Sequence, residues 1–390
     1  CVVDSEGALG GGVSMDPIEI PLQQSRLTAQ LTVPLRDYAL KIKPARTGAV
    51  ARTSEKLLSR DSEKLAVALQ GRMAFYDWVG AQAQLAMNEA SRDRLIELRD
   101  DAEQARSSGL MTQSDVLRID TQIILSDATI VQAEALVQIT AKQLSMLTGV
   151  AIADLKLGEN LHELPGRAER EPELQRSVEA AQTDRVEARR LALMEQSMVE
   201  ARKLARASML PRLDGFAEAT VANPNQVYFP LEDTWRASWM VGLQLTGSLS
   251  QTLVTRSHAR QAEAHIWALR SQAESLNQAI ELEVLSTWTE LERAHDTVAL
   301  TAEALDTTQQ IYDQQVLRFR GGEISATDII DTDMELLAAT VRHLHAHLDV
   351  HTAAARFETA SGQTKPLVLP TDQTDSSSIP SYMGLESMRP

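Results

Sequence analysis

The chain has 390 residues and a formal net charge of −16 at pH 7. This acidic balance excludes a basic nucleic-acid-binding face, so we expect no nucleic-acid partner. Aromatic residues make up only 4 % of the chain, and proline and glycine are scarce in the long segments, which is typical of long paired helices. The only cysteine, Cys1, excludes an intrachain disulfide. No run approaches the roughly 18 apolar residues of a membrane-spanning helix, so a membrane crossing would require a closed β-barrel.

Residues 1–40 are expected to form a first pair of strands with an outer loop. A short strand is expected at residues 1–3, and a stretch rich in glycine and proline follows it. Residues 26–35 then alternate between apolar and polar side chains, which predicts a strand with one face of each kind.

Residues 41–149 predict a first long helical hairpin. Its helices cover about 46–106 and 112–147, and Gly109 lies at the break between them. Residues 150–174 contain several glycines and prolines, so we expect a connector there.

Residues 175–212 are expected to hold one helix, over about 173–208, that ends before Pro211. The following segment, residues 213–250, predicts a second strand pair. Its strands are expected at 213–221 and 235–246, because apolar and polar residues alternate in the second of them and a polar turn lies between the two.

Residues 251–362 predict a second long hairpin with its tip at Gly321 and Gly322. Its first helix has a seam with a period of 3.5 residues, which would supercoil on a neighbouring helix. The seam residues are Trp288, Leu291, His295, Val298, Ala302, Leu305, Gln309, Tyr312, Val316 and Phe319.

Residues 363–390 are expected to form an extended tail.

The chain is an internal duplication with one constant offset. Gly109 and Gly322 lie 213 residues apart, as do Asp115 and Asp328. The glycines that close the two hairpins, Gly149 and Gly362, are separated by the same number. This unit is much longer than a solenoid repeat, whose period is about 20–50 residues.

Two strand pairs that each lead into a long hairpin with Gly-x5-Asp at its tip resemble the TolC family of outer membrane channels. Leu210-Pro211-Arg212-Leu213 before the strands and Leu147-Thr148-Gly149 at the hairpin end support this resemblance. The resemblance implies a mainly α protein with a small β part. It also implies a homotrimer in which each protomer gives four strands to one β-barrel and its coiled-coil hairpins to a trimeric α-helical barrel.

The resemblance further implies an exit duct in the outer membrane lipid, with its helical part in the periplasm. Such a duct belongs to a tripartite efflux pump or a type I secretion system, and it conducts drugs, as in multidrug resistance, other small molecules or proteins. Its partners would be a periplasmic membrane fusion (adaptor) protein and an inner membrane transporter. This function requires no enzyme activity and no cofactor.

Asp328 and Asp331 match the acidic residues that narrow the periplasmic entrance in this family. They lie three residues apart, on one helix face, and a trimer would arrange them as two rings that favour cations. The alternative is that Asp328 only caps the first turn of its helix. The matching positions in the first half are Asp115 and Arg118, so one acid is repeated and the other is not.

The hairpin tips are the expected docking sites of the adaptor. The resemblance also places an entrance lock at Asp115 and Phe319, with Arg320 or Arg318 in place of an arginine that the family has two residues after the second tip glycine, where this chain has Ile324. The tip residues are Gly109, Leu110, Thr112, Gly321, Gly322, Ile324 and Ser325.

Cys1 lies opposite Asp214 in the repeat, so the first half has no counterpart of the helix at 173–208. One expectation is that an N-terminal segment precedes the numbered chain. The other is that Cys1 is an acylated lipoprotein cysteine.

Aromatic residues near the second strand pair fit a membrane interface, although a soluble sheet could also bury them. They are Tyr228, Phe229, Trp235 and Trp239.

His343, His347 and His351 have a spacing that can bind zinc. No cysteine or suitable carboxylate completes the set, so we expect a polar helix surface and no metal.

The competing function is a soluble coiled-coil scaffold or adaptor protein. A scaffold of this kind does not need the alternating segments, which therefore favour the channel. No paired catalytic carboxylates, phosphate loop or nucleophile with a base is visible in the sequence, so we expect no enzyme.

Overall fold

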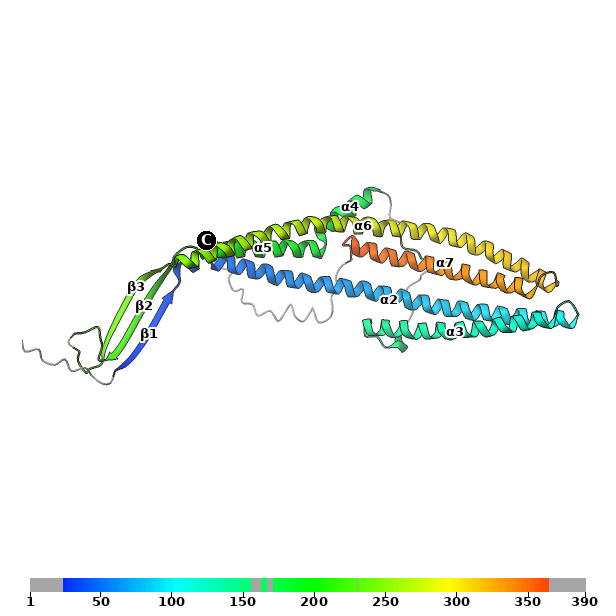
Figure 1. Cartoon of the computed structure of the whole chain (residues 1–390), viewed down its shortest axis with the longest axis horizontal. Coiled ribbons are helices and arrows are strands. Elements are labelled where there is room, and N and C mark those ends of the chain that lie inside the picture. Colours follow the sequence, from blue (N-terminus) through cyan, green and yellow to red (C-terminus); the bar gives the residue numbers. More distant parts are fainter. Residues whose placement is uncertain (1–23, 156–162, 167–170, 230, 365–390) are drawn as a thin grey trace, which may run out of the picture. The chain divides into compact units, whose positions relative to one another are not determined.

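The structure is a computed structural model that describes residues 24–155, 163–166, 171–229 and 231–364 (Figure 1). The expected strand at residues 1–3, Cys1 itself and nearly all of the expected tail lie outside these residues. The described chain forms two compact units, one of residues 1–50 and 196–266 and the other of residues 51–195 and 267–390. Each unit is described here by itself.

The first unit contains an antiparallel sheet with the strand order β1, β2, β3. Its strands are β1 (Ser25–Val33), β2 (Arg212–Asn223) and β3 (Arg236–Thr246). The two strands of the second pair are therefore confirmed, with bounds that differ by one or two residues from those expected. A short helix, α1 (Leu35–Leu40), follows β1.

Four long helices form two hairpins that are close to those expected. The first hairpin consists of α2 (Ile42–Ser107) and α3 (Gln113–Thr148), and the second of α6 (Leu249–Arg320) and α7 (Ala326–Ala360). With 66 and 72 residues, α2 and α6 are each about 100 Å long at 1.5 Å per residue. Their length places the tips far from the other ends of the same helices.

The duplication is visible in the backbone. Gly109, Gly149, Gly322 and Gly362 are the described glycines with positive φ, between 71° and 79°. In each tip the glycine amide donates to the carbonyl three residues earlier, and the next amide donates to the carbonyl five residues before it. This arrangement is a Schellman-type helix end, which requires a left-handed residue and therefore favours glycine.

Three apolar clusters hold the second unit together. The cluster next to the tips takes residues from all four long helices, including Leu98, Ile119, Phe319 and Ile329. The buried seam of α6 contributes Leu291, Val298, Tyr312 and Phe319 to these clusters, as its 3.5-residue period predicts.

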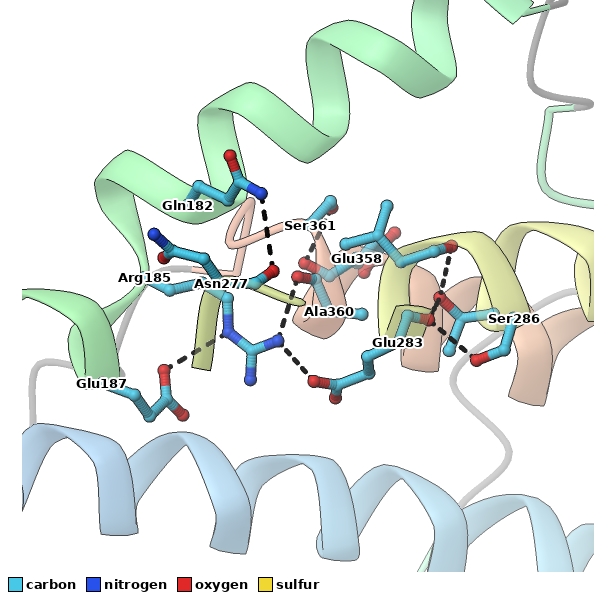
Figure 2. A network of polar contacts seen from close by, with 11 residues as sticks. Gln182, Arg185, Glu187, Asn277, Glu283, Ser286, Glu358, Ala360 and Ser361 are labelled. Atoms are coloured by element: carbon cyan, nitrogen blue, oxygen red, sulfur yellow. Dashed lines mark hydrogen bonds and ion pairs between the residues drawn. The ribbon is translucent and has the colours of Figure 1, made fainter. Parts of the chain in front are cut away.

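The single helix expected over 173–208 is wrong. The structure instead has α4 (Glu171–Asp184) and α5 (Val186–Ala207), which are separated at Arg185. The Arg185 side chain donates to Glu283 of α6 and to the Ala360 carbonyl of α7 (Figure 2). No proline or glycine marks this break, so a periodicity argument could not find it.

The expectation that no helix could cross a membrane also needs correction. By length and composition alone, α3 is apolar enough to cross a membrane, although only 11 % of its most apolar 18-residue segment is buried. The same composition suits a helix whose apolar stripe packs against another helix, because both environments remove apolar side chains from water.

Candidate functional site

The sheet has one apolar face and one largely polar face, and the strand register creates both. Partners in an antiparallel ladder point to the same side of the sheet. Ala29 pairs with Ala219, and Ala219 with Trp239; all three are apolar. The same holds for the set Leu31, Ala217 and Val241, for Leu27, Val221 and Ala237, and for Val33, Gly215 and Leu243.

The opposite face carries Thr28, Thr220 and Ser238 in one cross-strand set, and the two threonine hydroxyls lie 3.1 Å apart. The apolar face is bare in the protomer, where Trp239 is 80 % and Leu243 70 % exposed. An exposed apolar surface of this extent on strands of 9, 12 and 11 residues matches the dimensions of strands that cross a bilayer.

The four predicted interface aromatics lie in the loop between β2 and β3 and in β3 itself. Phe229 is 85 % and Trp235 60 % exposed. The Tyr228 hydroxyl donates to the Ala237 carbonyl at 3.0 Å, and the Arg236 guanidinium lies 5.2 Å from the centre of the Tyr228 ring. The structure thus brings Tyr228 to the start of β3, and the interface role of the group stays a prediction.

The two hairpin tips have the same capping box at equivalent positions. In the first tip the Thr112 amide and hydroxyl donate to Asp115 Oδ2 at 3.0 and 2.7 Å. In the second tip the Ser325 amide and hydroxyl donate to Asp328 Oδ2 at 3.0 and 2.8 Å. Each aspartate amide donates back to its cap hydroxyl at 3.3 Å, so four backbone and side-chain groups are satisfied reciprocally.

Both capping aspartates are held in the charged form. Hydrogen bonds from the Ser325 amide and hydroxyl lower the pKa of Asp328 below its usual value. Hydrogen bonds from the Thr112 hydroxyl and amide lower the pKa of Asp115, and the Ala326 amide of the second tip adds to this effect. Asp328 therefore caps its helix, as the alternative interpretation holds, yet its side chain and that of Asp331 remain exposed. That Asp328 and Asp331 form acidic rings at the periplasmic entrance stays a prediction.

The residues of the predicted entrance lock are placed as follows. Phe319 is fully buried in the tip cluster. Arg320 donates to Asp101 of α2 at 2.6 Å, and this bond raises the pKa of the arginine. The two tips also lie against each other at Gly322 and Leu110. A Cβ atom added to Gly322 would be 3.4 Å from Leu110 Cβ.

A buried polar group that sequence reasoning missed links α2, α6 and α7 behind the tips. Asp333 is 1 % exposed, and it accepts hydrogen bonds from Ser91 and, at 2.7 Å, from Arg94. The Arg94 guanidinium also lies 5.6 Å from the centre of the Tyr312 ring. Burial and the nearby Asp333 charge raise the pKa of Tyr312 to about 12. One signal was available: Asp333 lies on the helix face of Ile329 and Leu336, where an apolar residue is expected.

The three histidines of α7 do not all lie on a polar surface, and that expectation is wrong for His351. His351 is 2 % exposed and packs against Tyr76, with ring centres 5.6 Å apart. His343 lies against His347 and the Thr301 hydroxyl. Among the described residues there is no group of three or more His, Cys, Asp or Glu side chains that could hold a metal ion.

One side of α3 carries a bare apolar stripe. Its members recur every seven or eight residues, so they lie along one face of the helix. The stripe comprises Leu117, Ile124, Val131, Ile139 and Met146, with exposed fractions between 54 % and 74 %. Because a heptad spacing suits helix-to-helix packing, this side of α3 is suited to a further helix.

The fold with two long helical hairpins and an antiparallel sheet is shared by solved structures of outer membrane proteins and channels. VceC from Vibrio cholerae has a TM-score of 0.72 at 14 % identity, over 86 % of this chain and 79 % of its own. The open state of MtrE from Neisseria gonorrhoeae scores 0.66 at 15 % identity, over 87 % and 80 %. CmeC from Campylobacter jejuni scores 0.66 at 12 % identity, over 91 % and 80 %.

Residues 179–363 match the family of outer membrane efflux proteins. None of the curated proteins matches the chain significantly. This match covers most of the second repeat, and together with the shared fold it confirms the resemblance to the TolC family.

Proposed function

We propose that the protein is the outer membrane exit duct of a tripartite efflux pump or a type I secretion system. The observation that carries this function is the sheet: one face is apolar in four successive cross-strand sets, whereas the other is largely polar. In a closed barrel the first face would meet lipid and the second an aqueous lumen. The exposed edges of the described sheet would all be paired in such a barrel, because closure removes exposed edges.

The oligomer is a homotrimer in this proposal, in which each protomer adds four strands to the barrel and two hairpins to a periplasmic helical tunnel. The stripe on α3 supports it, since the apolar residues from Leu117 to Met146 would be covered by a helix of the next protomer. Arginine at both Val131 and Ile139 should convert the trimer into monomers in detergent. Mass measurement after extraction checks this, with arginine at the exposed positions Thr129 and Glu134 of α3, which flank the stripe at about 100° or more from its axis, as the matched control.

The tips would dock the periplasmic adaptor, which in turn contacts the inner membrane transporter. The exposed Leu110 and the capped turns at Thr112 and Ser325 support this proposal, because they present a fixed surface at the end of each hairpin. As a conducting subunit the protein performs no chemistry of its own. Its cargo passes through the lumen without covalent change.

The periplasmic entrance would be lined by Asp328 and Asp331, which set a preference for cations and bind multivalent ones. Asparagine at both positions should abolish block by multivalent cations in planar bilayer recordings. Asparagine at Asp115 is the matched control, since it removes the same capping charge from the first tip. Unchanged block in the double variant, or equal loss in the control, would exclude the two rings.

The exit-duct function itself is tested by the conductance of the purified protein in a bilayer. The proposal predicts discrete, cation-preferring channels. A protein that leaves bilayer conductance unchanged and remains soluble without detergent would instead be a coiled-coil scaffold.

A further inference from the structure

At one end of the sheet, every described strand meets a helix. Val33 ends β1 where Arg212 begins β2 and Thr246 ends β3, and Arg212 pairs with Thr246 across the ladder. At this end α1 follows β1, α5 precedes β2 and α6 follows β3 (Figure 1). The chain around this end belongs to the first unit. We define the junction as residues 34–50, 204–214 and 246–262.

The junction is basic, although the chain as a whole is acidic. The chain has 38 Lys and Arg against 54 Asp and Glu, whereas the junction has eight against two. Both acids of the junction already have partners. Asp37 forms ion pairs with Arg36 and Lys41. Asp214 forms an ion pair with Arg212. Five cations are left over, and they determine the charge of this surface.

These five cations are exposed and unpaired. Lys43 and Arg46 lie at the start of α2, Arg206 in the last turn of α5, and Arg256 and Arg260 near the start of α6. In the part of the chain that the structure describes, no hydrogen bond or ion pair joins any of these side chains to another residue. A surface with charges of one sign concentrates ions of the opposite sign. The junction therefore favours an anionic ligand.

Exposed apolar side chains lie among these cations. Tyr38, Leu210 and Leu253, one on each segment of the junction, are 64 %, 53 % and 68 % exposed. Leu35 of α1 packs on Gly215, where an added Cβ atom would lie 3.7 Å from Leu35 Cδ1, and Gly215 belongs to the apolar face of the sheet. The junction is thus continuous with that face. A surface that only meets water would not need apolar residues among its charges, whereas a membrane interface favours tyrosine, lysine and arginine beside apolar groups.

The unpaired cations can reach a bilayer from their helices. Lys43 follows Leu35, the first residue of α1, by eight residues, and Arg256 follows Leu249, the first residue of α6, by seven. This separation is about 10–12 Å of helix at 1.5 Å per residue. Helical side chains lean towards the N-terminus of their helix, and both α1 and α6 begin at the sheet. Lysine and arginine therefore extend their charged ends towards the head groups, which occupy roughly 5–8 Å outside the hydrocarbon core.

The opposite end of the sheet has no such excess of positive charge. Between the end of β2 and the start of β3, residues 224–236 contain Glu232, Asp233 and Arg236. Arg236 forms an ion pair with Glu232. Arg26, at the start of β1, donates to Gln226 at 3.2 Å. Two cations and two acids balance at this end, so the basic surface marks only one side of the sheet.

We propose that the five unpaired cations of the junction bind the phosphate groups of anionic phospholipids in the periplasmic leaflet of the outer membrane. This inference rests on the exit-duct function, which places the sheet in the bilayer and the helices in the periplasm. The lipid phosphate accepts charge-assisted hydrogen bonds from the guanidinium and ammonium groups, and successive copies of the chain surround the barrel with one basic girdle. The girdle residues are Lys43, Arg46, Arg206, Arg256 and Arg260.

The first test measures which lipid the protein selects. The full chain is reconstituted in phosphatidylcholine bilayers that contain a trace of spin-labelled phosphatidylglycerol or phosphatidylcholine, and electron spin resonance gives the immobilised fraction of each. We expect the protein to favour phosphatidylglycerol by about threefold or more, and salt should reduce this ratio.

Two triple variants locate the selectivity. Glutamine at Lys43, Arg206 and Arg256 removes one cation from each segment of the junction and should lower the ratio by about twofold or more. The matched control has glutamine at three exposed cations of the helical hairpins and should keep the ratio of the unchanged chain. An equal ratio for the two triple variants would overturn the proposal and leave these cations to a polypeptide partner. The control positions are Lys142, Arg293 and Arg342.

The second test measures where the head groups lie. In a Cys1→Ser background, a fluorophore is attached to Ser257→Cys in the junction or to Ser286→Cys on the same face of α6, about 44 Å further along the helix; both positions are exposed. Lipids with a nitroxide on the head group should quench the first fluorophore and leave the second unchanged. A fluorophore at Val241→Cys, on the apolar sheet face, should be quenched by lipids with a nitroxide on the acyl chain.

The outcomes separate the girdle from the exit duct. Quenching at Val241→Cys without quenching at Ser257→Cys would overturn the girdle and leave the exit duct intact. Absence of quenching at Val241→Cys would contradict the exit duct, and the girdle would fall with it.

Discussion

The first hairpin (α2 and α3) and the second (α6 and α7) have the same backbone at their tips but different surroundings. Both tips turn on a left-handed glycine and begin their second helix with a Ser or Thr and Asp capping box. The second hairpin, however, has two exposed acids where the first has Asp115 and Arg118. Turn geometry has been kept in both copies, whereas the charge next to the tips has diverged.

The largest expected effect comes from the buried group that joins the two hairpins. Asp333→Ala should lower the free energy of unfolding by about 3–5 kcal/mol, because it leaves the Arg94 charge partly buried without its carboxylate. Chemical denaturation of the detergent-extracted protein measures this. Asp331→Ala, an exposed position two residues away, should change it by less than about 0.5 kcal/mol. Equal effects of the two substitutions would mean that the link between the hairpins carries no stability.

Alanine at the tip glycines should lower the free energy of unfolding by less than Asp333→Ala does. The values for the two tips show whether both have the same turn. Gly109→Ala should cost about 1–2 kcal/mol from the left-handed backbone alone. Gly322→Ala should cost at least as much, since its Cβ also approaches Leu110. Gly321→Ala is the control, because this glycine is not among those with positive φ. A Gly321→Ala cost as large as that of Gly322→Ala would contradict the assigned turn.

The next smaller effect on the free energy of unfolding is expected from the helix caps. Thr112→Ala and Ser325→Ala should each cost about 1 kcal/mol, and the two values should agree because the capping boxes have the same geometry. The measurement is the same denaturation midpoint. Since the folded-state pKa of Asp328 and of Asp115 is lowered, the stability that these caps contribute is present above pH of about 4 and is lost as the pH falls further. A cost that does not diminish in acid would contradict the charged capping box.

The last effect is confined to alkaline pH. The folded-state pKa of Tyr312 is raised to about 12, so the stability that it contributes is complete below pH of about 10 and is lost as the pH rises towards 12. Difference absorbance of the phenolate between the protein and Tyr312→Phe isolates this group. Asp333→Ala should move its midpoint downward. A midpoint at the ordinary value of about 10 would disprove its burial beside Asp333.

Much of the fold could be predicted because it repeats simple local signals. Gly109 and Gly322 interrupt segments in which other breakers are scarce, and alternation marks the strands, so most elements and the 213-residue offset could be found from residue types alone. The break at Arg185 could not, because the side chain that stabilises it reaches Glu283 and Ala360, far away in the sequence. Arg94 and Asp333 were missed for the same reason: 239 residues separate them, and only packing brings them together.

For the candidate sites, too, local features could be predicted and contacts between distant segments could not. The capping role of Asp328 was visible from its spacing to Ser325, whereas the partner of Arg320, Asp101, depends on how α2 and α6 pack.

The central claim is that copies of this chain close a barrel with the apolar sheet face outward. Electron microscopy of the detergent-extracted protein, combined with mass determination, tests it most directly. We expect a threefold hollow particle in which the sheets of successive protomers continue one barrel and the α3 stripe is covered. A water-soluble monomer or dimeric rod, with the face around Trp239 buried against its own helices, would contradict it.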